Sequence, residues 1–458
     1  MTVAVVGGGI SGLTAAWTLA GQGHEVIVIE AAPVIGGKLR TATVADVRVD
    51  VGAEAMLARR PEGVALLEEL GLTPIAPLTT AAMVRAGGAL HPLPARTLLG
   101  IPGDLDALAD SGVLTEHALD RVAAEPDLDP LPPLHEDVSV GGLVRARLGN
   151  ELTDRLVEPL LGGVYAGRAD ALSLRAAIPA LADALSSGGS LIDAARSIVA
   201  GPAARERPRS GPVFVSLKGG LGSLPEALAS HGRFDVRTGV TVRAIRRSGS
   251  GFVLDYGAVP VSEELAVDGV VVATPPAKAA RLLAEVAPDA ATELAKIETA
   301  SMAIVTLAYD DVELPPGSGL LVGAREGLAI KGITVSSQKW PLDTGGLTVM
   351  RASVGRIGEA RLLQRGDDDL IRLVRHELLE ILGIRAEPVD SLVTRWGGGL
   401  PQYAVGHVEK IARIRDAVAA APGVAVCGAA FDGVGIPACI ASAGAAVAHL
   451  GEWSHGRR

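Results

Sequence analysis

The sequence predicts an α/β fold that opens with a β–α–β unit, and three observations near its first residue support this prediction. Residues 2–6 (TVAVV) form a short apolar, β-branched run typical of a buried strand. Residues 10–23 carry apolar side chains at helical spacing and end on Gly23, a residue that commonly stops helices. Residues 25–30 (EVIVIE) predict a second strand that ends on Glu30. Strand, helix and strand in this order are typical of a parallel sheet.

The turn between the first strand and the helix carries glycines in the spacing G-x-G-x-x-G. Because an acid follows 18 residues after the last of them, the pattern predicts the dinucleotide-binding fingerprint of a Rossmann-like domain. Such glycines make a tight turn, admit a pyrophosphate and let the helix pack on the strand, while the helix N-terminus attracts phosphates. The predicted cofactor contacts in this unit are Gly7, Gly9, Ile10, Ser11, Gly12 and Glu30.

Two other interpretations of this segment are a glycine-rich turn without a ligand and a secretory signal peptide. Residues 1–23 contain no acidic or basic side chain. A signal peptide, however, has a basic segment before its apolar run, and here none precedes the run and glycines interrupt it. The nucleotide-binding unit is the stronger interpretation.

The residues after Glu30 distinguish a flavin from a nicotinamide dinucleotide. Two further glycine-bearing segments follow closely, AAPVIGGKLRT (31–41) and VDVGAEAM (49–56). This arrangement resembles the extended FAD-binding pattern of the flavin amine oxidase superfamily, in which the glycine pair and nearby basic residues contact the ribityl–pyrophosphate. The alternative for the basic residues is a solvated turn. The positions concerned are Gly36, Gly37, Lys38, Arg40 and Gly52.

Composition narrows the classes of partner and of site. A formal net charge of −10 argues against nucleic acid as a partner. No 18-residue apolar stretch lacks glycine, proline and charge, so we expect no transmembrane segment. Cys427 and Cys439 form neither a CxxC motif nor a disulfide framework, which suits a reduced, cytoplasmic protein. The nine histidines show no metal-ligand spacing, so we expect no metal site.

The order of patterns along the chain predicts three domains. We expect an FAD-binding domain built from both ends of the chain (1–75, 213–280 and 400–458), an α+β substrate-binding domain (76–97 and 281–399) and an inserted helical domain (98–212). A proline- and arginine-rich linker (201–212) ends the helical part. The last segment (423–450) predicts a strand, a glycine-rich turn and a helix that begins near Pro437.

Longer stretches resemble the FAD-dependent porphyrinogen oxidases, which oxidise protoporphyrinogen or coproporphyrinogen. The resemblance covers nearly all of the chain in order, and 136–177 and 395–407 (RWGGGLPQYAVGH) are its most specific parts. It implies a haem-biosynthetic flavoenzyme that removes six electrons and six protons from a porphyrinogen while O₂ becomes peroxide. It also implies that the helical domain can contact a membrane peripherally. The other stretches are 216–228, 333–341 and 431–444.

By this resemblance, Val242 lies by the adenine and Gly433, Gly435 and Ile436 lie along the flavin ring. There the dipole of the last helix favours negative charge on reduced flavin. No residue stands out as a catalytic base. Gly163 and Tyr165 are expected to shape a packing turn. For three other residues with aromatic or imidazole rings, a packing role is the alternative to a role in the site. The three are Trp396, Tyr403 and His407.

The choice of porphyrinogen depends on local cationic side chains. Because the protein is acidic overall, each substrate propionate that it binds needs a nearby lysine or arginine. Candidate propionate contacts are Arg59, Arg60, Lys331 and Arg351, for which the alternative is ordinary surface charge. We expect coproporphyrinogen III, because the alanine- and arginine-rich composition is typical of a high-GC bacterium and the soluble bacterial branch of the family resembles coproporphyrinogen oxidases. Protoporphyrinogen IX is the alternative. Less favoured are an amine oxidase or desaturase-like enzyme, whose amine-flanking aromatic pair is not evident, and a flavin-containing scaffold protein.

Overall fold

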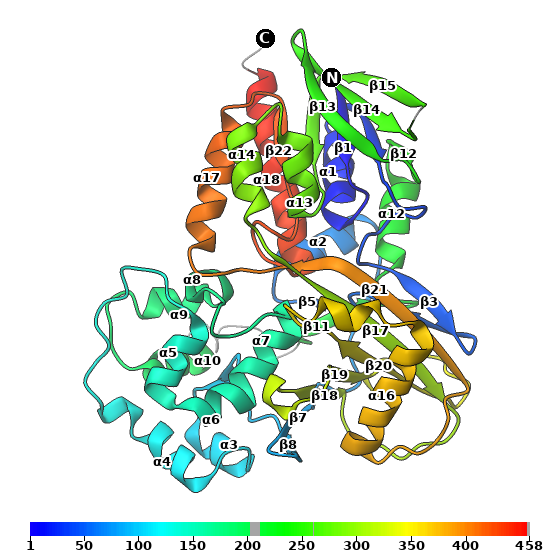
Figure 1. The fold of residues 1–458 in the computed structure, drawn as a ribbon. Helices are drawn as coiled ribbons and strands as arrows, with labels where there is room; N and C mark the ends of the chain where they lie inside the picture. The colour runs from blue at the N-terminus through cyan, green and yellow to red at the C-terminus, as the bar shows by residue number, and fades with distance from the viewer. Residues whose placement is uncertain (202–210, 260, 456–458) are drawn as a thin grey trace.

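The computed structural model describes residues 1–201, 211–259 and 261–455 (Figure 1). Most of the predicted linker 201–212 lies outside this part of the chain. A five-stranded parallel sheet has the order β12-β2-β1-β16-β22. Strands from the beginning, the middle and the end of the chain therefore lie side by side in one sheet. The five strands are β1 (Thr2–Val6), β2 (Glu25–Ile29), β12 (Asp235–Arg237), β16 (Gly269–Val272) and β22 (Val424–Val426).

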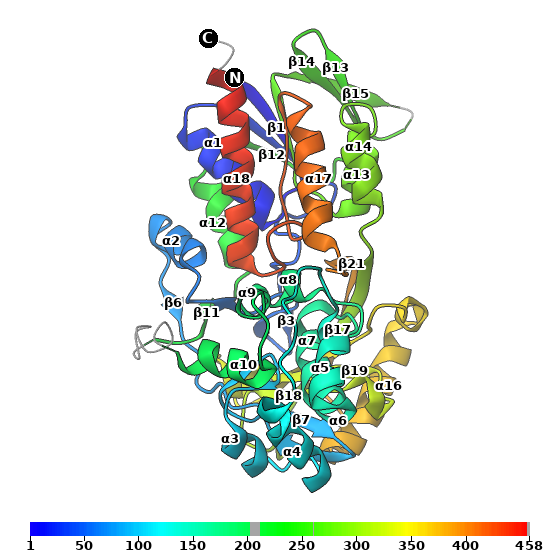
Figure 2. The same cartoon turned by 90° about the vertical axis from the view of Figure 1, so that its left-hand side faces the viewer.

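Both faces of the parallel sheet are covered, which explains why its strands are continuous apolar runs (Figure 2). Val3 and Val5 of β1 pack with α1 (Ile10–Gly21), α12 (Ser223–His231) and α18 (Ile436–His455). Ala4 and Val6 face the opposite layer. That layer contains the antiparallel strands β13 (Val242–Ser248), β14 (Gly251–Gly257) and β15 (Ser262–Val267), and the helices α13 (Pro276–Leu283), α14 (Pro288–Ala295) and α17 (His407–Ala419).

A second, mixed sheet has seven strands in the order β21-β17-β20-β19-β18-β7-β8. Helix α16 (Asp367–Leu382) packs on one face of it, and the hairpin β3 (Thr41–Val44) and β4 (Val47–Asp50) packs on the other. The strands are β7 (Met83–Ala86), β8 (Ala89–Pro92), β17 (Thr299–Tyr309), β18 (Gly319–Val322), β19 (Ile330–Val335), β20 (Thr348–Val354) and β21 (Asp390–Pro401).

The segment predicted to be helical is helical, and it packs around its own apolar core. It begins, however, with part of a short antiparallel pair, β9 (Thr97–Leu98) and β10 (Ile101–Pro102), which the sequence did not predict. Its helices are α3 (Leu105–Asp110), α4 (Glu116–Ala123), α5 (Val140–Leu148), α6 (Asn150–Leu152), a π-helical turn at Thr153–Val157, α7 (Glu158–Tyr165), α8 (Leu174–Ala177), α9 (Pro179–Ala184) and α10 (Leu191–Ala200).

The remaining short elements connect these parts. A three-stranded sheet joins β11 (Phe214–Leu217) antiparallel to β5 (Met56–Leu57) and β6 (Pro74–Ile75), next to α2 (Pro61–Glu69). One-turn helices are η1 (Glu125–Asp127), η3 (Ala324–Glu326), α15 (Ser336–Lys339) and η4 (Ala360–Gln364).

Helices α13 and α14 and residue Ile297 belong to the layer that covers one face of the parallel sheet. Residues 281–297 therefore belong to that core rather than to the seven-stranded sheet, whose next strand starts at Thr299. Within the described ranges, no helix is both long and apolar enough to cross a lipid bilayer. Nor do three or more potential metal ligands cluster there. Both cysteines are buried free thiols.

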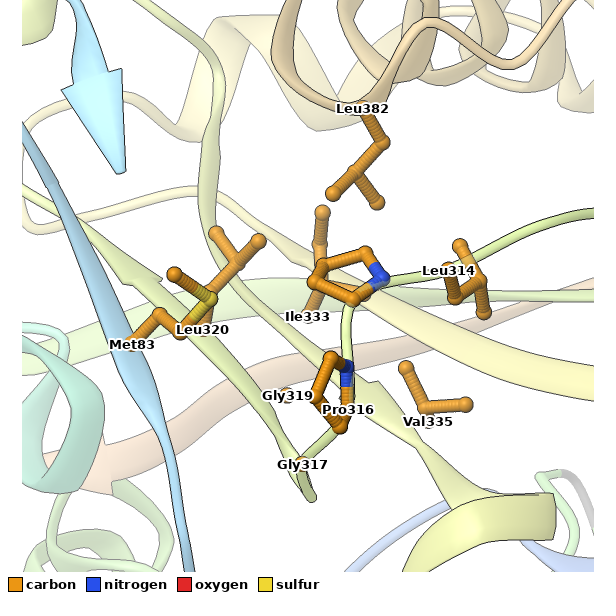
Figure 3. Close-up of a pocket in the computed structure, with 10 residues that line it drawn as sticks. Met83, Leu314, Pro316, Gly317, Gly319, Leu320, Ile333, Val335 and Leu382 are labelled. Carbon is orange, nitrogen blue, oxygen red and sulfur yellow. The ribbon is translucent and has the colours of Figure 1, made fainter. Parts of the chain in front are cut away.

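A small apolar pocket lies between the seven-stranded sheet and the end of α16 (Figure 3). Met83 and Leu320 line it from two neighbouring strands, and Leu382 lines it from the helix. Leu320 belongs to the core on the α16 face of the sheet, and Leu382 packs against that core. This pocket therefore lies on the far side of the sheet from the glycine segments.

Candidate active site

The loop after β1 is held so tightly that only glycine fits at two of its positions. Gly7 has φ +114°, donates its N–H to the Ile29 carbonyl at 2.9 Å, and would place a Cβ 2.7 Å from the Ala273 oxygen. A Cβ at Gly12 would lie 1.9 Å from the Gly7 oxygen. By contrast, a Cβ at Gly9 would meet no atom within 4 Å. The loop is thus packed on the protein side and open at Gly9.

Glu30 directly follows β2 and ties this loop to the chain that follows. Its two carboxylate oxygens accept hydrogen bonds from the Gly8 and Ala32 N–H groups, each at 2.7 Å. Its main-chain oxygen accepts from Val240 N–H at 2.9 Å, which brings the start of β13 and Val242 alongside. The Val242 side chain is buried in the core of that layer.

The second glycine segment lies directly against the first. Gly36 N–H donates to the Gly8 oxygen at 2.7 Å, and a Cβ at Gly37 would lie 3.2 Å from Gly9 Cα. Lys38 donates through Nζ to the Gly399 oxygen at the end of β21, and burial lowers its pKa. The Arg40 side chain is exposed. The geometry therefore favours a role in the site for Lys38 and a solvated position for Arg40.

Gly52 stands between this segment and the seven-stranded sheet. A Cβ there would lie 1.9 Å from the Lys38 oxygen and 3.2 Å from Trp396 Cζ2. The Trp396 indole N–H donates to the Val51 oxygen at 3.0 Å. Arg351 donates through Nη2 to the Gly52 oxygen. Trp396 and Arg351 thus both hold the main chain around Gly52.

Glu54, whose side chain is 13% exposed, is an acid that sequence analysis missed. It forms ion pairs with Lys339 and Arg351, which come from α15 and β20. Burial alone would raise the pKa of Glu54, but these two cations hold it below its ordinary value. The available signal was an acid two residues after Gly52 in a run of small residues. Its partners are 285 and 297 residues away, so the pairing was not readable from the sequence.

The turn between β22 and α18 reaches the same edge of the parallel sheet. Gly433 has φ +133°, and a Cβ there would lie 2.9 Å from Ala438 Cβ. Helix α18 begins at Ile436, one residue before Pro437, as predicted, and Cys439 N–H donates to the Gly435 oxygen at 3.0 Å. Helices α1 and α18 pack against each other in one core, to which the first residue of each helix, Ile10 and Ile436, belongs. In open α/β sheets, the crevice at the carboxyl ends of the strands is where ligands bind.

Tyr403 and His407 both face this turn. The Tyr403 hydroxyl donates to the Ala429 oxygen at 2.7 Å, and His407 Nε2 lies 2.9 Å from the Ala430 oxygen. Burial raises the pKa of Tyr403 and lowers that of His407 to about 4. A neutral imidazole whose Nε2–H is donated to a carbonyl is poorly suited to acid–base catalysis. The contacts favour the packing role for both residues.

Tyr165, at the end of α7, lies against this pair, with its ring centroid 5.5 Å from that of Tyr403. It is buried, as expected of a residue in a packing turn. A Cβ at Gly163 would lie 3.3 Å from Leu321 Cδ2, so this glycine faces β18. The end of α7 therefore contacts both the seven-stranded sheet and Tyr403, which bonds to the C-terminal turn.

The four predicted propionate contacts do not form one cluster. Arg59 is exposed, and Arg60 pairs with Glu62 at 2.8 Å while Asp432 of the C-terminal turn also helps to raise its pKa. Lys331, on β19, is 4% exposed, and burial and the Arg356 charge lower its pKa to about 8. Arg351 is committed to Glu54 and to the Gly52 oxygen, so its guanidinium is not open to a substrate carboxylate.

These segments fit a dinucleotide. The loop after β1 presents open main chain at Gly9 beside the α1 N-terminus, where an anionic pyrophosphate is favoured. Glu30 offers a charged acceptor next to it. The second segment and the C-terminal turn lie at the same edge of the parallel sheet.

Comparison with known proteins agrees with this fit. The family described as flavin-containing amine oxidoreductase matches residues 10–450. The chain is 38% identical to a Mycobacterium leprae protein named coproporphyrinogen III oxidase, over 97% of each chain. It is 32% identical to a Bacillus subtilis protein of the same name, again over 97% of each. A crystal structure of a putative protoporphyrinogen oxidase from Exiguobacterium sp. 255-15 superimposes with a TM-score of 0.86 and 33% identity over 98% of each chain.

Proposed function

The chain belongs to the flavin-containing amine oxidoreductase family, and on this basis we propose that it oxidises coproporphyrinogen III to coproporphyrin III in haem biosynthesis. Its cofactor is FAD. The observation that carries the proposal is the similarity, along 97% of both chains, to proteins named coproporphyrinogen III oxidase. The rare aromatic residues and the buried position of Phe431 in the C-terminal turn do not favour an amine substrate.

We propose that three segments of the crevice hold the cofactor. The loop after β1 would contact the pyrophosphate, Glu30 a ribose, and the C-terminal turn the flavin ring. When bound, FAD supplies a two-electron acceptor, so three cycles account for the six electrons of the reaction. The proposed contacts are Gly7, Gly9, Ile10, Ser11, Gly12, Glu30, Gly37, Lys38, Gly52, Val242, Gly433, Gly435 and Ile436.

The chain's own residues would contribute orientation rather than proton transfer. The α18 N-terminus would stabilise negative charge near its first turn. Trp396 and Lys38 would keep Gly52 and Gly399 in place, as their hydrogen bonds to main-chain oxygens suggest. Because Tyr403 and His407 already use their donors on carbonyls, the pyrrole protons would leave to solvent or to a main-chain oxygen.

We also propose the division into three functional parts, with one boundary moved. The FAD-binding part would comprise 1–75, 213–297 and 400–458, since α13 and α14 pack in its core. The substrate-binding part would then comprise 76–97 and 298–399, and the helical part 98–212. The cytoplasmic location and a peripheral membrane contact of the helical part stay predictions.

For the propionates, we propose Arg59, Arg60 and Lys331, and we no longer propose Arg351. Arg60 lies at the start of α2, near the C-terminal turn, and its side chain is 42% exposed. Replacing Arg60 by Glu should raise KM more for the four-propionate substrate than for protoporphyrinogen IX. An equal change of both KM values would contradict the assignment.

Anaerobic bleaching of the flavin tests the proposal directly. Coproporphyrinogen III should bleach the bound flavin rapidly and protoporphyrinogen IX more slowly, while primary amines should have no effect. Faster bleaching by protoporphyrinogen IX would favour the second candidate, which the similarity to the Exiguobacterium protein supports. Bleaching by amines alone would overturn both.

We propose O₂ as the electron acceptor, with three molecules reduced to three of peroxide per porphyrin formed. Aerobic turnover should therefore yield peroxide and porphyrin in a ratio of three to one. Turnover that requires an added quinone and produces no peroxide would contradict this part of the proposal.

A further inference from the structure

The turn that precedes α18 is held from outside by two side chains of one short segment. Tyr403 donates to the Ala429 oxygen at 2.7 Å, and His407 Nε2 lies 2.9 Å from the next carbonyl oxygen, that of Ala430. The two rings stack with centroids 4.0 Å apart and planes inclined by 18°. Each residue is 2% exposed. Two adjacent carbonyls are therefore fixed by a rigid, buried pair.

This pair is itself anchored to the helical part of the chain. The Ser173 N–H donates to the main-chain oxygen of Tyr403 at 2.8 Å. Gln402, the preceding residue, donates through Nε2 to the Tyr165 oxygen at 2.8 Å, and the Tyr165 ring lies beside Tyr403. Through Tyr403, the turn is therefore connected to the end of α7 and to the residue that precedes α8.

Apart from this pair, the turn is held by a partly exposed ion pair, Arg415 with Asp432 at 2.6 Å, and by two longer hydrogen bonds. Phe431 N–H donates to the Gly428 oxygen at 3.2 Å, and Gly428 N–H donates to Ser442 Oγ at 3.2 Å. Both are longer than the bonds made by Tyr403 and His407. Gly433 and the α18 N-terminus follow within a few residues. A shift of the two carbonyls would therefore be passed on to Gly433 and to the first residues of α18.

We propose that Tyr403 and His407 are positioning residues that set the distance between the α18 N-terminus and the FAD ring. The inference rests on the proposed function, because it takes FAD as the ligand of the crevice. It differs from a catalytic role, since neither side chain needs to touch the cofactor or the porphyrinogen. Its signature is a change in the reduction potential of the bound flavin rather than a loss of fold.

The test compares Tyr403→Phe, His407→Phe and His407→Gln in the FAD-loaded protein. Both Phe variants should shift the flavin midpoint potential to more negative values, because the α18 N-terminus would stabilise reduced flavin less well. They should lower kcat roughly threefold to tenfold, as expected for one lost hydrogen bond, with little change in KM. His407→Gln keeps an N–H donor and should restore most of the potential.

Tyr309→Phe is a matched control. Tyr309 is 1% exposed, lies in the core under α16, and has no hydrogen-bond partner for its hydroxyl within the described residues. Its variant should leave the potential unchanged. The proposal is overturned if Tyr403→Phe and the His407 variants shift the potential no more than Tyr309→Phe does. The potential requires no porphyrinogen, so a protein that fails to oxidise coproporphyrinogen III would refute the proposed function while still testing this inference.

Discussion

The loop after β1 and the turn before α18 lie at the same edge of the parallel sheet, yet they are held by different physical means. The loop is fixed by main chain packed on main chain: Gly7 bonds to Ile29, and Gly12 leaves no room for a Cβ. The turn is fixed by side chains that arrive from another segment, those of Tyr403 and His407. Steric exclusion tolerates no added atom, whereas a hydrogen bond can be lost with the fold intact. Changes in the loop should therefore affect folding, and changes at the turn should affect alignment.

Replacement of Gly12 by Ala should have the largest effect. The new Cβ would lie 1.9 Å from the Gly7 oxygen, so strand and helix must separate, and the free energy of unfolding should fall by more than about 3 kcal/mol. Thermal unfolding of the FAD-free protein measures it. Gly21→Ala is the control: it lies in the same helix, its Cβ meets nothing within 4 Å, and it should stabilise by roughly 0.5–1 kcal/mol. Equal effects at both positions would contradict the steric explanation.

The contact of His407 with the turn should make the free energy of unfolding depend on pH. Burial, with a smaller effect of Lys410, lowers the pKa of His407 to about 4 from its ordinary 6.5, while the Ala430 carbonyl and Asp137 oppose the shift. A lowered folded-state pKa means that His407 supports the fold fully above pH 6.5 and that this support is lost as the pH falls toward 4. The loss amounts to roughly 3 kcal/mol when complete.

His407→Gln should remove this loss, so that its unfolding free energy depends less on pH between 7 and 4 than that of the wild type. Urea unfolding at several pH values measures the difference. Asp50, whose pKa burial raises to about 6, acts in the opposite direction over part of this range but equally in both proteins. Parallel pH profiles would show that His407 is not the group responsible.

Glu30→Ala should weaken FAD binding by about 1.5–3 kcal/mol, through loss of a charged acceptor for a ribose hydroxyl. The structure adds a second effect: Gly8 and Ala32 lose the carboxylate that accepts their N–H groups at 2.7 Å. The FAD-free protein should therefore also lose stability. Titration of FAD into the apo-protein, with a parallel melting curve, separates the two effects. Unchanged FAD affinity would refute the ribose contact.

Gly9→Ala should have the smallest effect on the fold. Its Cβ would meet no protein atom within 4 Å, so the FAD-free protein should change by less than about 0.5 kcal/mol. FAD affinity should nevertheless fall, because the proposed pyrophosphate approaches the main chain there. If FAD binds this variant as well as it binds the wild type, the cofactor does not approach Gly9.

Features that depend on neighbours along the chain could be predicted from the sequence alone. Residues 2–30 predicted strand, turn, helix and strand, and the structure confirms β1, α1 and β2. The start of α18 beside Pro437 was also predicted, because a proline in a first turn is a local signal. In each case the structure depends on signals only a few residues apart, such as the spacing of apolar residues, a glycine in a tight turn or a proline in a first turn.

The pairing of charges and donors, by contrast, became visible only in the folded chain. Arg351 was predicted to contact propionate, but Glu54, 297 residues away, occupies it. Tyr403 and His407 could be catalytic or packing residues until their carbonyl partners, 26 and 23 residues away, were seen. Residues 281–297 were likewise predicted to belong to the substrate-binding domain, but α13 and α14 pack in the core beside the parallel sheet. The chemistry of a side chain is given by the residue itself. Its partner depends on which distant segment the fold brings beside it, and that depends on how the layers pack.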